Sequence, residues 1–540
     1  MPTSTPAQST PAQPAPAQEP DAAARRTPGR VPRVTLALGV GVAVLLLIAL
    51  TLGLATASPV GVEDNGDGYR LTCGAGLAPA TVDGLASWKG GVVGDFTRTA
   101  ACPDRQPSSA WVVLKASTVG HPLTWSLTTL GWWYAGLVGI VGALTAWAAS
   151  ARGLRRAAVV AVPLTPLAVP AFSRFFVSTY GEPAGLLGTA AAVCGVAGLL
   201  VTRPADRSAR GVALALLAGG GLVAGTAKLA YLPVLAVALV VCAVVAVGRG
   251  RGRRVAGPAV ALVTAAAVVA PLGVAAGRQD AQYASVNTHD VVFTMALREL
   301  GPVALGPLGL PPEARAVIGN GYFNGPPRPE ADWWRRAVLD EPGTTRRAAY
   351  VELAAHPAAA LRALGTGLEA TARADLPYLA SGPADPAVVS PPSGDVGWSG
   401  AQQPQLDRVL DATRRPTWVP AVVVLLALAT AVAAGLRAVR RRRPGFARWG
   451  AGAGIAAGTA LALVAVAVFG DGYFEVFKHV WLAAYLLAVS ALCLVGAAVG
   501  GVVRPASAYS SVTAGSAGAA RGGSGPRRAA GARASRISER

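Results

Sequence analysis

The chain alternates long apolar runs with short polar segments that are rich in arginine. About ten of the runs approach or exceed the ~20 residues that a helix needs to cross a bilayer. They are 34–56, 131–149, 157–172, 183–201, 211–227, 229–248, 256–275, 418–437, 450–469 and 479–503. The pattern predicts an all-α polytopic membrane protein whose helices pack closely through alanine and glycine.

Two polar segments are much longer than a connection between helices requires. One covers 58–130, and the other runs from 276 to 417 and contains a helical pattern from Thr345 to Arg373. Because loops of that length are usually functional, we expect the second to form a partly helical, extracytoplasmic loop domain. The expected organisation is a disordered tail (1–33), an N-terminal transmembrane module (34–275), the loop domain (276–417), C-terminal transmembrane helices (418–503) and a disordered basic tail (504–540).

The arginine clusters all fall on one side of the membrane when the ten spans are counted. The clusters are Arg25–Arg33, Arg152–Arg156, Arg203–Arg210, Arg249–Arg254, Arg440–Arg443 and the C-terminal tail. Positive charge marks the cytoplasmic side, so both termini are predicted inside and both long polar segments outside, in a bacterial plasma membrane. The sequence Ala55-Thr56-Ala57 could mimic a signal-peptide cleavage site, but the charged leader before it is long, which favours a retained helix.

Composition agrees with this picture and narrows the function. The 540 residues are 52% hydrophobic and only 14% charged, whereas a soluble domain carries nearer a quarter charged residues. The net charge of +20 does not indicate nucleic-acid binding, because the arginines are divided among short clusters and not gathered on one soluble face. No P-loop, Rossmann glycine pattern, zinc spacing or Gly-x-Ser-x-Gly turn occurs, which disfavours a nucleotide-sugar donor.

Cysteine usage suggests one disulfide. Cys73 and Cys102 both lie in the first long polar segment, whereas the other three cysteines lie inside apolar runs. If that segment faces an oxidising space, a bond between Cys73 and Cys102 is plausible.

A short acidic turn, residues 63–70, follows directly on the first span. It reads Glu63-Asp64-Asn65-Gly66-Asp67-Gly68-Tyr69-Arg70. Ionisable groups beside hydrocarbon are costly, so they are functional candidates, although Asn-Gly and Asp-Gly pairs also favour plain turns. The turn begins like a calcium loop but has Gly74 where the last acid is expected, while a divalent metal shared with a donor phosphate stays possible.

Other ionisable groups fall beside the same predicted membrane face. They are Arg174 and Glu182, which flank Tyr180, then Lys228, Asp471, Lys478 and His479. Partly buried carboxylates can act as bases, and arginine and lysine bind phosphate. Transfer from a polyprenyl-phosphate sugar needs both, since the acceptor hydroxyl loses a proton and the leaving phosphate gains charge.

These motifs, taken in order, resemble the GT-C class of membrane glycosyltransferases. More narrowly, residues 64–70, 175–183 and 470–472 with Lys478-His479 are similar to motifs of bacterial hexose transferases of S-layer and cell-envelope glycan biosynthesis. The resemblance implies an inverting transfer of a hexose from a polyprenyl-phosphate carrier to an envelope glycan or glycolipid. The acid of the first loop would be the base, here Asp64 or Asp67. The first polar segment, 58–130, lacks the Asp-Glu dipeptide common in the class, which leaves that choice open, with a slight preference for Asp67 because its glycine neighbours leave it accessible.

The remaining assignments each have a plainer alternative. We expect Arg174, Lys228, Lys478 and His479 to bind the donor phosphate, and Arg70, Tyr180, Glu182 and Asp471 to bind substrate. Arg174 could instead be a snorkelling anchor, Glu182 a helix N-terminal acid before Pro183, and the others interfacial or topological charges. At the level of the whole chain, the alternatives are a transporter or flippase of lipid-linked glycans and a non-catalytic envelope assembly protein. Transporters place polar groups near mid-membrane, which the apolar spans here do not.

Overall fold

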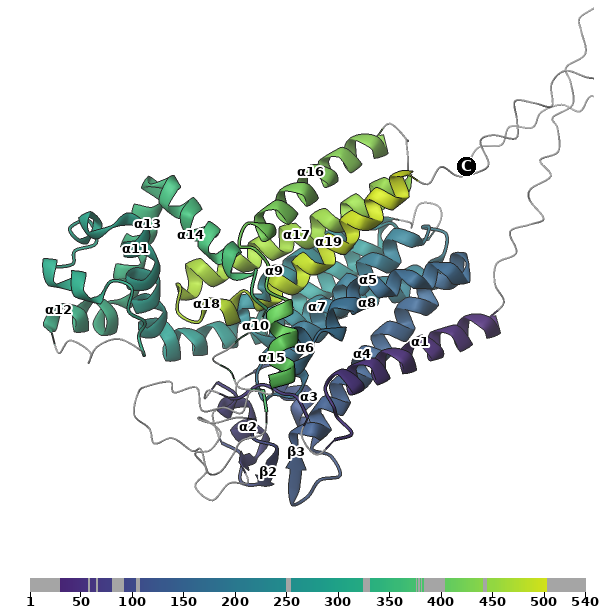
Figure 1. Cartoon of the computed structure of the whole chain (residues 1–540), viewed down its shortest axis with the longest axis horizontal. Coiled ribbons are helices and arrows are strands. Elements are labelled where there is room, and N and C mark those ends of the chain that lie inside the picture. The colour runs from purple at the N-terminus through teal and green to yellow at the C-terminus, as the bar shows by residue number, and fades with distance from the viewer. Residues whose placement is uncertain are drawn as a thin grey trace, which may run out of the picture.

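The computed structural model describes residues 30–56, 59–64, 67–79, 92–102, 107–248, 254–323, 331–374, 376, 379, 381–382, 404–439 and 444–502. Within these ranges, eight helices are long and apolar enough to cross a membrane. They are α1 (Arg30–Thr51), α4 (Leu127–Ala149), α7 (Glu182–Val201), α8 (Arg207–Ala227), α10 (Ala256–His289), α16 (Val419–Val439), α17 (Pro444–Asp471) and α19 (Trp481–Val502). Figure 1 shows them gathered into one bundle, which confirms the all-α polytopic fold.

The other two expected spans are not plain membrane helices. Residues 157–172 fall in a broken path whose halves, Leu154–Ala168 and Pro170–Phe176, are bent by 74°. Prolines within this stretch remove backbone donors and clash with the preceding turn, so it divides into short pieces. The pieces, after η2 (Ser150–Arg152), are η3 (Leu154–Val160), α5 (Ala161–Leu164), η4 (Thr165–Ala168), α6 (Pro170–Ser173) and η5 (Arg174–Phe176).

The span expected at 229–248 is shorter than predicted. It comprises η6 (Leu229–Tyr231) and α9 (Leu232–Val244), and then the backbone turns extended at Val245. The N–H of Gly248 donates to the carbonyl of Pro204 over 2.7 Å. This hydrogen bond ties the chain to the α7–α8 connection after the helix has ended.

Small residues bring the helices of the N-terminal module into backbone contact, as the composition predicted. A side chain at Gly188 or Gly195 of α7 would collide with backbone atoms of α8, and one at Gly220 of α8 would collide with the backbone of α7. Without a hydrophobic difference between lipid and helix, such close packing is a main source of association in a bilayer.

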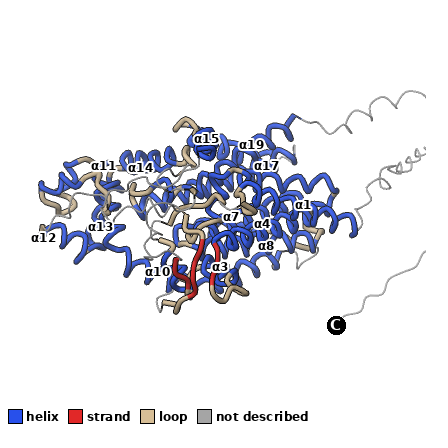
Figure 2. Tube along the Cα trace, turned by 60° about the horizontal axis from the view of Figure 1, so that its bottom comes forward, coloured by secondary structure: helices blue, strands red, loops and turns tan. Residues whose placement is uncertain are grey.

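The first polar segment contains a small sheet that the sequence analysis did not predict. Strands β1 (Leu77–Pro79), β2 (Asp95–Arg98) and β3 (Thr124–Ser126) pair antiparallel in that order, beside α2 (Tyr69–Ala75) and α3 (Ser109–Ser117). Figure 2 shows the red strands close to α3 at the edge of the helices. Ser58, Asn65 and Gly66 of this segment lie outside the described residues.

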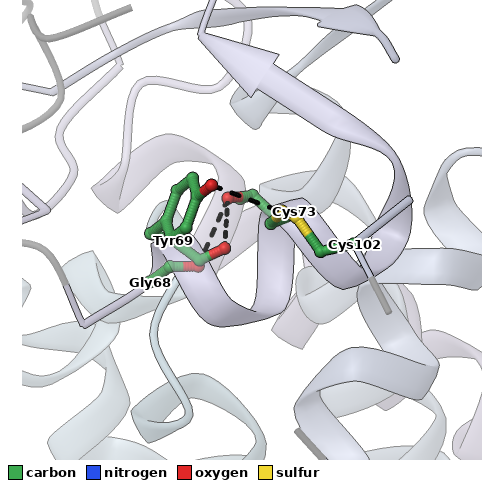
Figure 3. Close-up of a disulfide and its surroundings, with 5 residues drawn as sticks. Gly68, Tyr69, Cys73 and Cys102 are labelled. Carbon is green, nitrogen blue, oxygen red and sulfur yellow. Dashed lines mark hydrogen bonds between the residues drawn. A yellow bond between two sulfur atoms is a disulfide. The ribbon is translucent and has the colours of Figure 1, made fainter. Parts of the chain in front are cut away.

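Cys73 of α2 forms a disulfide with Cys102, with Cα atoms 5.3 Å apart (Figure 3). The bond closes a loop over a sequence separation of 29 residues. In the chain-entropy model, closing a loop of this size stabilises the folded state by about 3–4 kcal/mol. It therefore fixes the helix that follows the acidic turn against the sheet.

The second polar segment does not begin at residue 276, because α10 continues without a break to His289. A π-helical stretch, η8 (Asp290–Ala296), extends it directly into the loop domain. The predicted helix over 345–373 is divided at His356 into α13 (Pro342–Ala355) and α14 (Pro357–Ala370), since Pro357 cannot continue the preceding helix. The lobe at the left of Figure 1 holds these two helices with α11 (Leu297–Leu300), η9 (Pro302–Leu305), η10 (Pro312–Val317), α12 (Asp332–Trp334) and the π-helical η11 (Arg335–Asp340). Helix α15 (Pro404–Ala412) follows, and α18 (Val476–His479) lies between α17 and α19.

The described charges gather at two opposite ends of the bundle. At the end that we call the basic end, Arg152 pairs with Asp206 at 2.7 Å, while Arg33 and Arg156 donate to backbone carbonyls at the ends of α4 and α7. The cavity end carries the acidic turn and the α17–α18 turn. The clusters at 249–253 and 440–443 and most of both tails lie outside the described residues.

Candidate functional site

A cavity of about 180 Å³ opens at the cavity end, between α2, the start of α7, the α8–η6 turn, α10 and the α17–α18 turn. These elements are far apart in the sequence, so only the fold brings their side chains together. The cavity is lined by eight ionisable residues other than tyrosine: Asp67, Arg70, Glu182, Lys228, Asp290, Asp471, Glu475 and His479. Six of them are among the residues predicted from the sequence.

Lys478 joins the acidic turn to the α17–α18 turn. Its Nζ lies 2.8 Å from Oδ2 of Asp67 and 2.6 Å from Oε2 of Glu475, and its side chain is only 1% exposed. The Asp67 side chain is 42% exposed and faces the cavity. Burial works against ionisation of Asp67, but the charges of Lys478 and Lys228 outweigh it and hold the pKa of Asp67 well below its usual range. Asp67 is therefore ionised beside Lys478.

Asp64 serves a different purpose from Asp67. Its Oδ1 accepts the Gly68 N–H at 2.9 Å, and its Oδ2 accepts the Thr179 hydroxyl at 2.8 Å. A side chain at Gly68 would collide with both Asp64 and Thr179. The space beside Gly68 is thus filled by the protein, which corrects the expectation that this glycine leaves room for an acceptor. Asp64 shapes the turn and does not line the cavity.

A second ion pair lies on another wall of the cavity. Lys228 Nζ lies 3.1 Å from Oε1 of Glu182, and the Glu182 side chain is 3% exposed. Although burial alone would lower it, the pKa of Lys228 is raised, chiefly by the charge of Glu182. Tyr180 donates its hydroxyl to the Glu63 carbonyl at 2.8 Å, and its ring lies 5.5 Å from the Lys478 ammonium. The segment between η5 and α7, which contains Tyr180, therefore braces the acidic turn.

The α17–α18 turn is held in an unusual backbone conformation. Gly472 has φ +70°, and a side chain there would collide with the backbone carbonyl of Asp290. Glu475 has φ +48°, the single positive value among the described non-glycine residues. Such strain persists only where the surroundings enforce it, and it often accompanies function. Within the turn, Asp471 lies 3.0 Å from His479 Nδ1.

Two sequence-predicted residues are placed differently. Arg174 is fully buried and donates to the carbonyls of Leu376 and Leu379 at 3.4 Å each, and it does not line the cavity. It thus fastens the end of the loop domain to the bundle. Arg70 does line the cavity, with its guanidinium 4.3 Å from the ring centre of Tyr283 on α10.

The sequence analysis missed the contribution of α10. Gln279, Tyr283, Asn287 and Asp290 all line the cavity, and they follow one helical face. The signal was present as polar residues at i, i+4 and i+8 just beyond an apolar span. It was overlooked because the span was expected to end at 275. Nearer the N-terminus of the same helix, Leu272 and Ala275 also line the cavity and give it an apolar wall.

No group of three or more His, Cys, Asp or Glu side chains suited to hold a metal occurs among the residues that the structure describes. The carboxylates at the acidic turn and at the start of α7 are paired with lysines instead.

The fold and the cavity define a multi-pass membrane protein with a charged candidate site at one end of its helix bundle. Residues 25–381 match the family described as the YfdI N-terminal transmembrane domain. The match covers about two thirds of the 540 residues, and the chain therefore belongs to this family. No curated protein and no solved structure matches the chain significantly.

Proposed function

We propose that the protein is a glycosyltransferase that moves a hexose from a polyprenyl-phosphate carrier to an envelope glycan or glycolipid. The observation that carries the proposal is the ion pair between Lys478 and Asp67, because Asp67 lines a cavity that also has an apolar wall. A base, a cation and an apolar surface in one cavity suit a donor that combines a lipid chain, a phosphate and a sugar. The resemblance to the GT-C class supports the same reading.

Lys228, which lines the cavity, is assigned to the donor phosphate together with Lys478, which is buried against Asp67 and does not itself line the cavity. His479 and Arg70 line the cavity nearby. Both lysines pair with carboxylates, Lys228 with Glu182, and Lys478 with Asp67 and Glu475. A phosphate entering the cavity would share these cations with the carboxylates. Charge-assisted hydrogen bonds of this kind are about twice as strong as neutral ones.

Asp67 is assigned as the base, and Asp64 as the residue that holds the turn. The choice rests on placement, because Asp67 lines the cavity while the two oxygens of Asp64 accept hydrogen bonds from Gly68 and Thr179. Asp67 is a weak base while Lys478 is beside it. When the phosphate draws on the charge of Lys478, the pKa of Asp67 rises towards the working range, so donor binding prepares the base.

The proposed step is a single displacement. The acceptor oxygen forms a bond to the anomeric carbon as the bond from that carbon to the phosphate oxygen breaks, and its electron pair leaves with the phosphate. Asp67 takes the acceptor proton, and Lys228 and Lys478 stabilise the charge on the released polyprenyl phosphate. Attack opposite the leaving group inverts the configuration of the sugar.

The apolar wall supports a lipid-linked donor over a soluble one. Leu272 and Ala275 lie on a helix that crosses the membrane, and Leu229 lies next to Lys228. A polyprenyl chain could lie along this wall with its phosphate at the lysines. The ionisable groups of the cavity stand at one end of the bundle, which weighs against the transporter alternative, where polar groups near mid-membrane are expected.

The test uses the purified full-length protein and a panel of polyprenyl-phosphate hexoses labelled in the sugar. We expect at least one donor to lose its sugar to an envelope-glycan acceptor, or slowly to water, with release of polyprenyl phosphate. The matched control is Asp67→Asn, which keeps the size of the side chain and removes its basicity. Intact donors across the whole panel, with acceptor present, would contradict the enzyme proposal, and vesicle translocation of an unchanged donor would favour a flippase.

A further inference from the structure

The polar face of α10 forms a second zone in the cavity, distinct from the lysines. Gln279, Tyr283 and Asn287 are partly buried and line the cavity four residues apart, and Asp290 follows one helical turn later. Two amides, a phenol and a carboxylate offer several hydrogen-bond donors and acceptors along one line. This is chemistry suited to a ring that carries several hydroxyl groups.

Asp290 is the most constrained member of this face. It is 2% exposed, and its Oδ1 accepts the Tyr322 N–H at 2.8 Å. Its backbone belongs to a π-helical stretch, a feature often found at functional sites, and Gly472 packs against its carbonyl. Within the described parts of the chain, no cation pairs with the Asp290 carboxylate. A buried carboxylate that lines a cavity without a paired cation is suited to accept hydrogen bonds from hydroxyl groups and not to bind phosphate.

Tyr283 connects this face to the phosphate zone. The guanidinium of Arg70 lies over its ring at 4.3 Å, and Arg70 is electrostatically coupled to Asp67. Along α10, the residues that line the cavity change from apolar (Leu272 and Ala275) to polar (Gln279 and Asn287), and Lys228 lines the same cavity. A lipid-linked donor likewise passes from an apolar prenyl chain, through a phosphate, to a sugar.

We infer that Gln279, Tyr283, Asn287 and Asp290 form the subsite for the hexose of the donor and recognise its ring hydroxyls. The inference rests on the proposed function, and it adds which residues recognise the sugar. It assigns specificity to a transmembrane helix, while the acidic turn supplies the base. Each neutral hydrogen bond lost should weaken binding of the sugar by roughly 3–10-fold.

The experiment measures binding of the same polyprenyl phosphate with and without its hexose, using the full-length protein in lipid nanodiscs. The variants are Asn287→Ala, Gln279→Ala and Asp290→Asn. The control is Gln282→Ala, because Gln282 lies on α10, is exposed and does not line the cavity. Wild type and control should bind the glycosylated carrier more tightly than the bare one. Each cavity variant should lose roughly 3–10-fold of that preference and keep its affinity for the bare carrier.

Failure of the inference can be separated from failure of the proposed function. Variants that keep the full wild-type preference, or a wild type that binds both carriers equally, would overturn the sugar subsite while leaving a phosphate site. A wild type that binds neither carrier would overturn the proposed function and the subsite together. Gln279 and Asn287 are partly exposed, so their variants should fold even if Asp290→Asn does not.

Discussion

The two ends of the helix bundle use charge in opposite ways. At the basic end, Arg156 and Arg210 donate to carbonyls at the end of α7, and Arg152 pairs with Asp206 where both side chains keep some exposure. At the cavity end, Lys478 is 1% exposed and is shared between two carboxylates. One end spreads positive charge over helix ends, and the other concentrates both signs around a cavity.

The difference shows which charges need a functional explanation. Arginines at helix C-termini satisfy free carbonyls and set the orientation of the chain in the membrane, so they need no ligand. A buried lysine beside two acids is costly to desolvate, and such groups in membrane proteins mark sites by default. The predictions below test whether the two ends differ in accessibility, in catalysis, in pH response and in stability.

The largest effect should be all-or-none labelling from the two sides of the membrane. Val119 is 78% exposed at the cavity end, and Val255 is 63% exposed at the start of α10. We expect a membrane-impermeant maleimide to label Val119→Cys in intact cells, and Val255→Cys only after permeabilisation, because arginine clusters stay in the cytoplasm. The unbonded native cysteines are buried and give little background. The reverse labelling pattern would show that the cavity faces the cytoplasm.

Next in size is the effect of removing a carboxylate at each end. Asp67→Asn should lower turnover by roughly 10²–10⁴-fold, the usual contribution of a general base. Asp206→Asn is the matched control, since Asp206 pairs with Arg152 at the basic end, and its turnover should stay near that of wild type. Turnover is measured as sugar release from the lipid-linked donor. Equal losses in both variants would mean that the two ends do not differ in catalysis.

A smaller effect should appear in the pH profile when Lys478 is replaced. Lys478→Gln removes the main charge that holds the pKa of Asp67 down, so that pKa should rise. Asp67 must be ionised to act, and therefore kcat/KM of the variant should fall as the pH is lowered, over a range where wild type is flat. Donor affinity should also weaken roughly 10–100-fold, as expected for loss of a charged hydrogen bond. An unchanged pH profile of kcat/KM would show that Asp67 does not act as the base.

The smallest effect should come from the ion pair at the basic end. Arg152→Ala removes the partner of Asp206, but both side chains are partly exposed, at 27% and 19%. Such pairs contribute at most about 1 kcal/mol to the free energy of unfolding, which can be followed by titrating the purified protein with SDS in mixed micelles. If Arg152→Ala lowered the free energy of unfolding by several kcal/mol, the ion pair at the basic end would contribute as much to stability as a buried one.

Hydropathy predicted most of the helices but not where α10 ends. Eight expected spans are long helices, because uninterrupted apolar runs must satisfy their backbone within the helix. The run around Pro163, Pro166 and Pro170 was read as a span although its prolines break it. Gln279 and Asn287 were assigned to a loop because polarity was taken as the end of the helix, whereas a helix can continue beyond the bilayer or along a polar cavity.

The candidate site was predicted as a set of residue types on one face and not as an arrangement. The acidic turn, Lys228, Asp471 and Lys478 were predicted to be neighbours at one membrane face, and in the structure they line or underlie one cavity. Arg174 was grouped with them by sequence position, but its guanidinium points to the carbonyls of Leu376 and Leu379. Distance along the membrane plane cannot be read from a hydropathy pattern.

The sequence by itself determined the class of protein, because apolar run length and arginine placement act locally and additively. Only the tertiary structure decided that Asp67 faces the cavity while Asp64 is enclosed by Thr179 and Gly68. It alone decided that Lys478, more than 400 positions from Asp67, neutralises it at 2.8 Å. The physical reason is that the state of a charged group depends on the distance and burial of its partners, and both are set by packing between segments far apart in the chain.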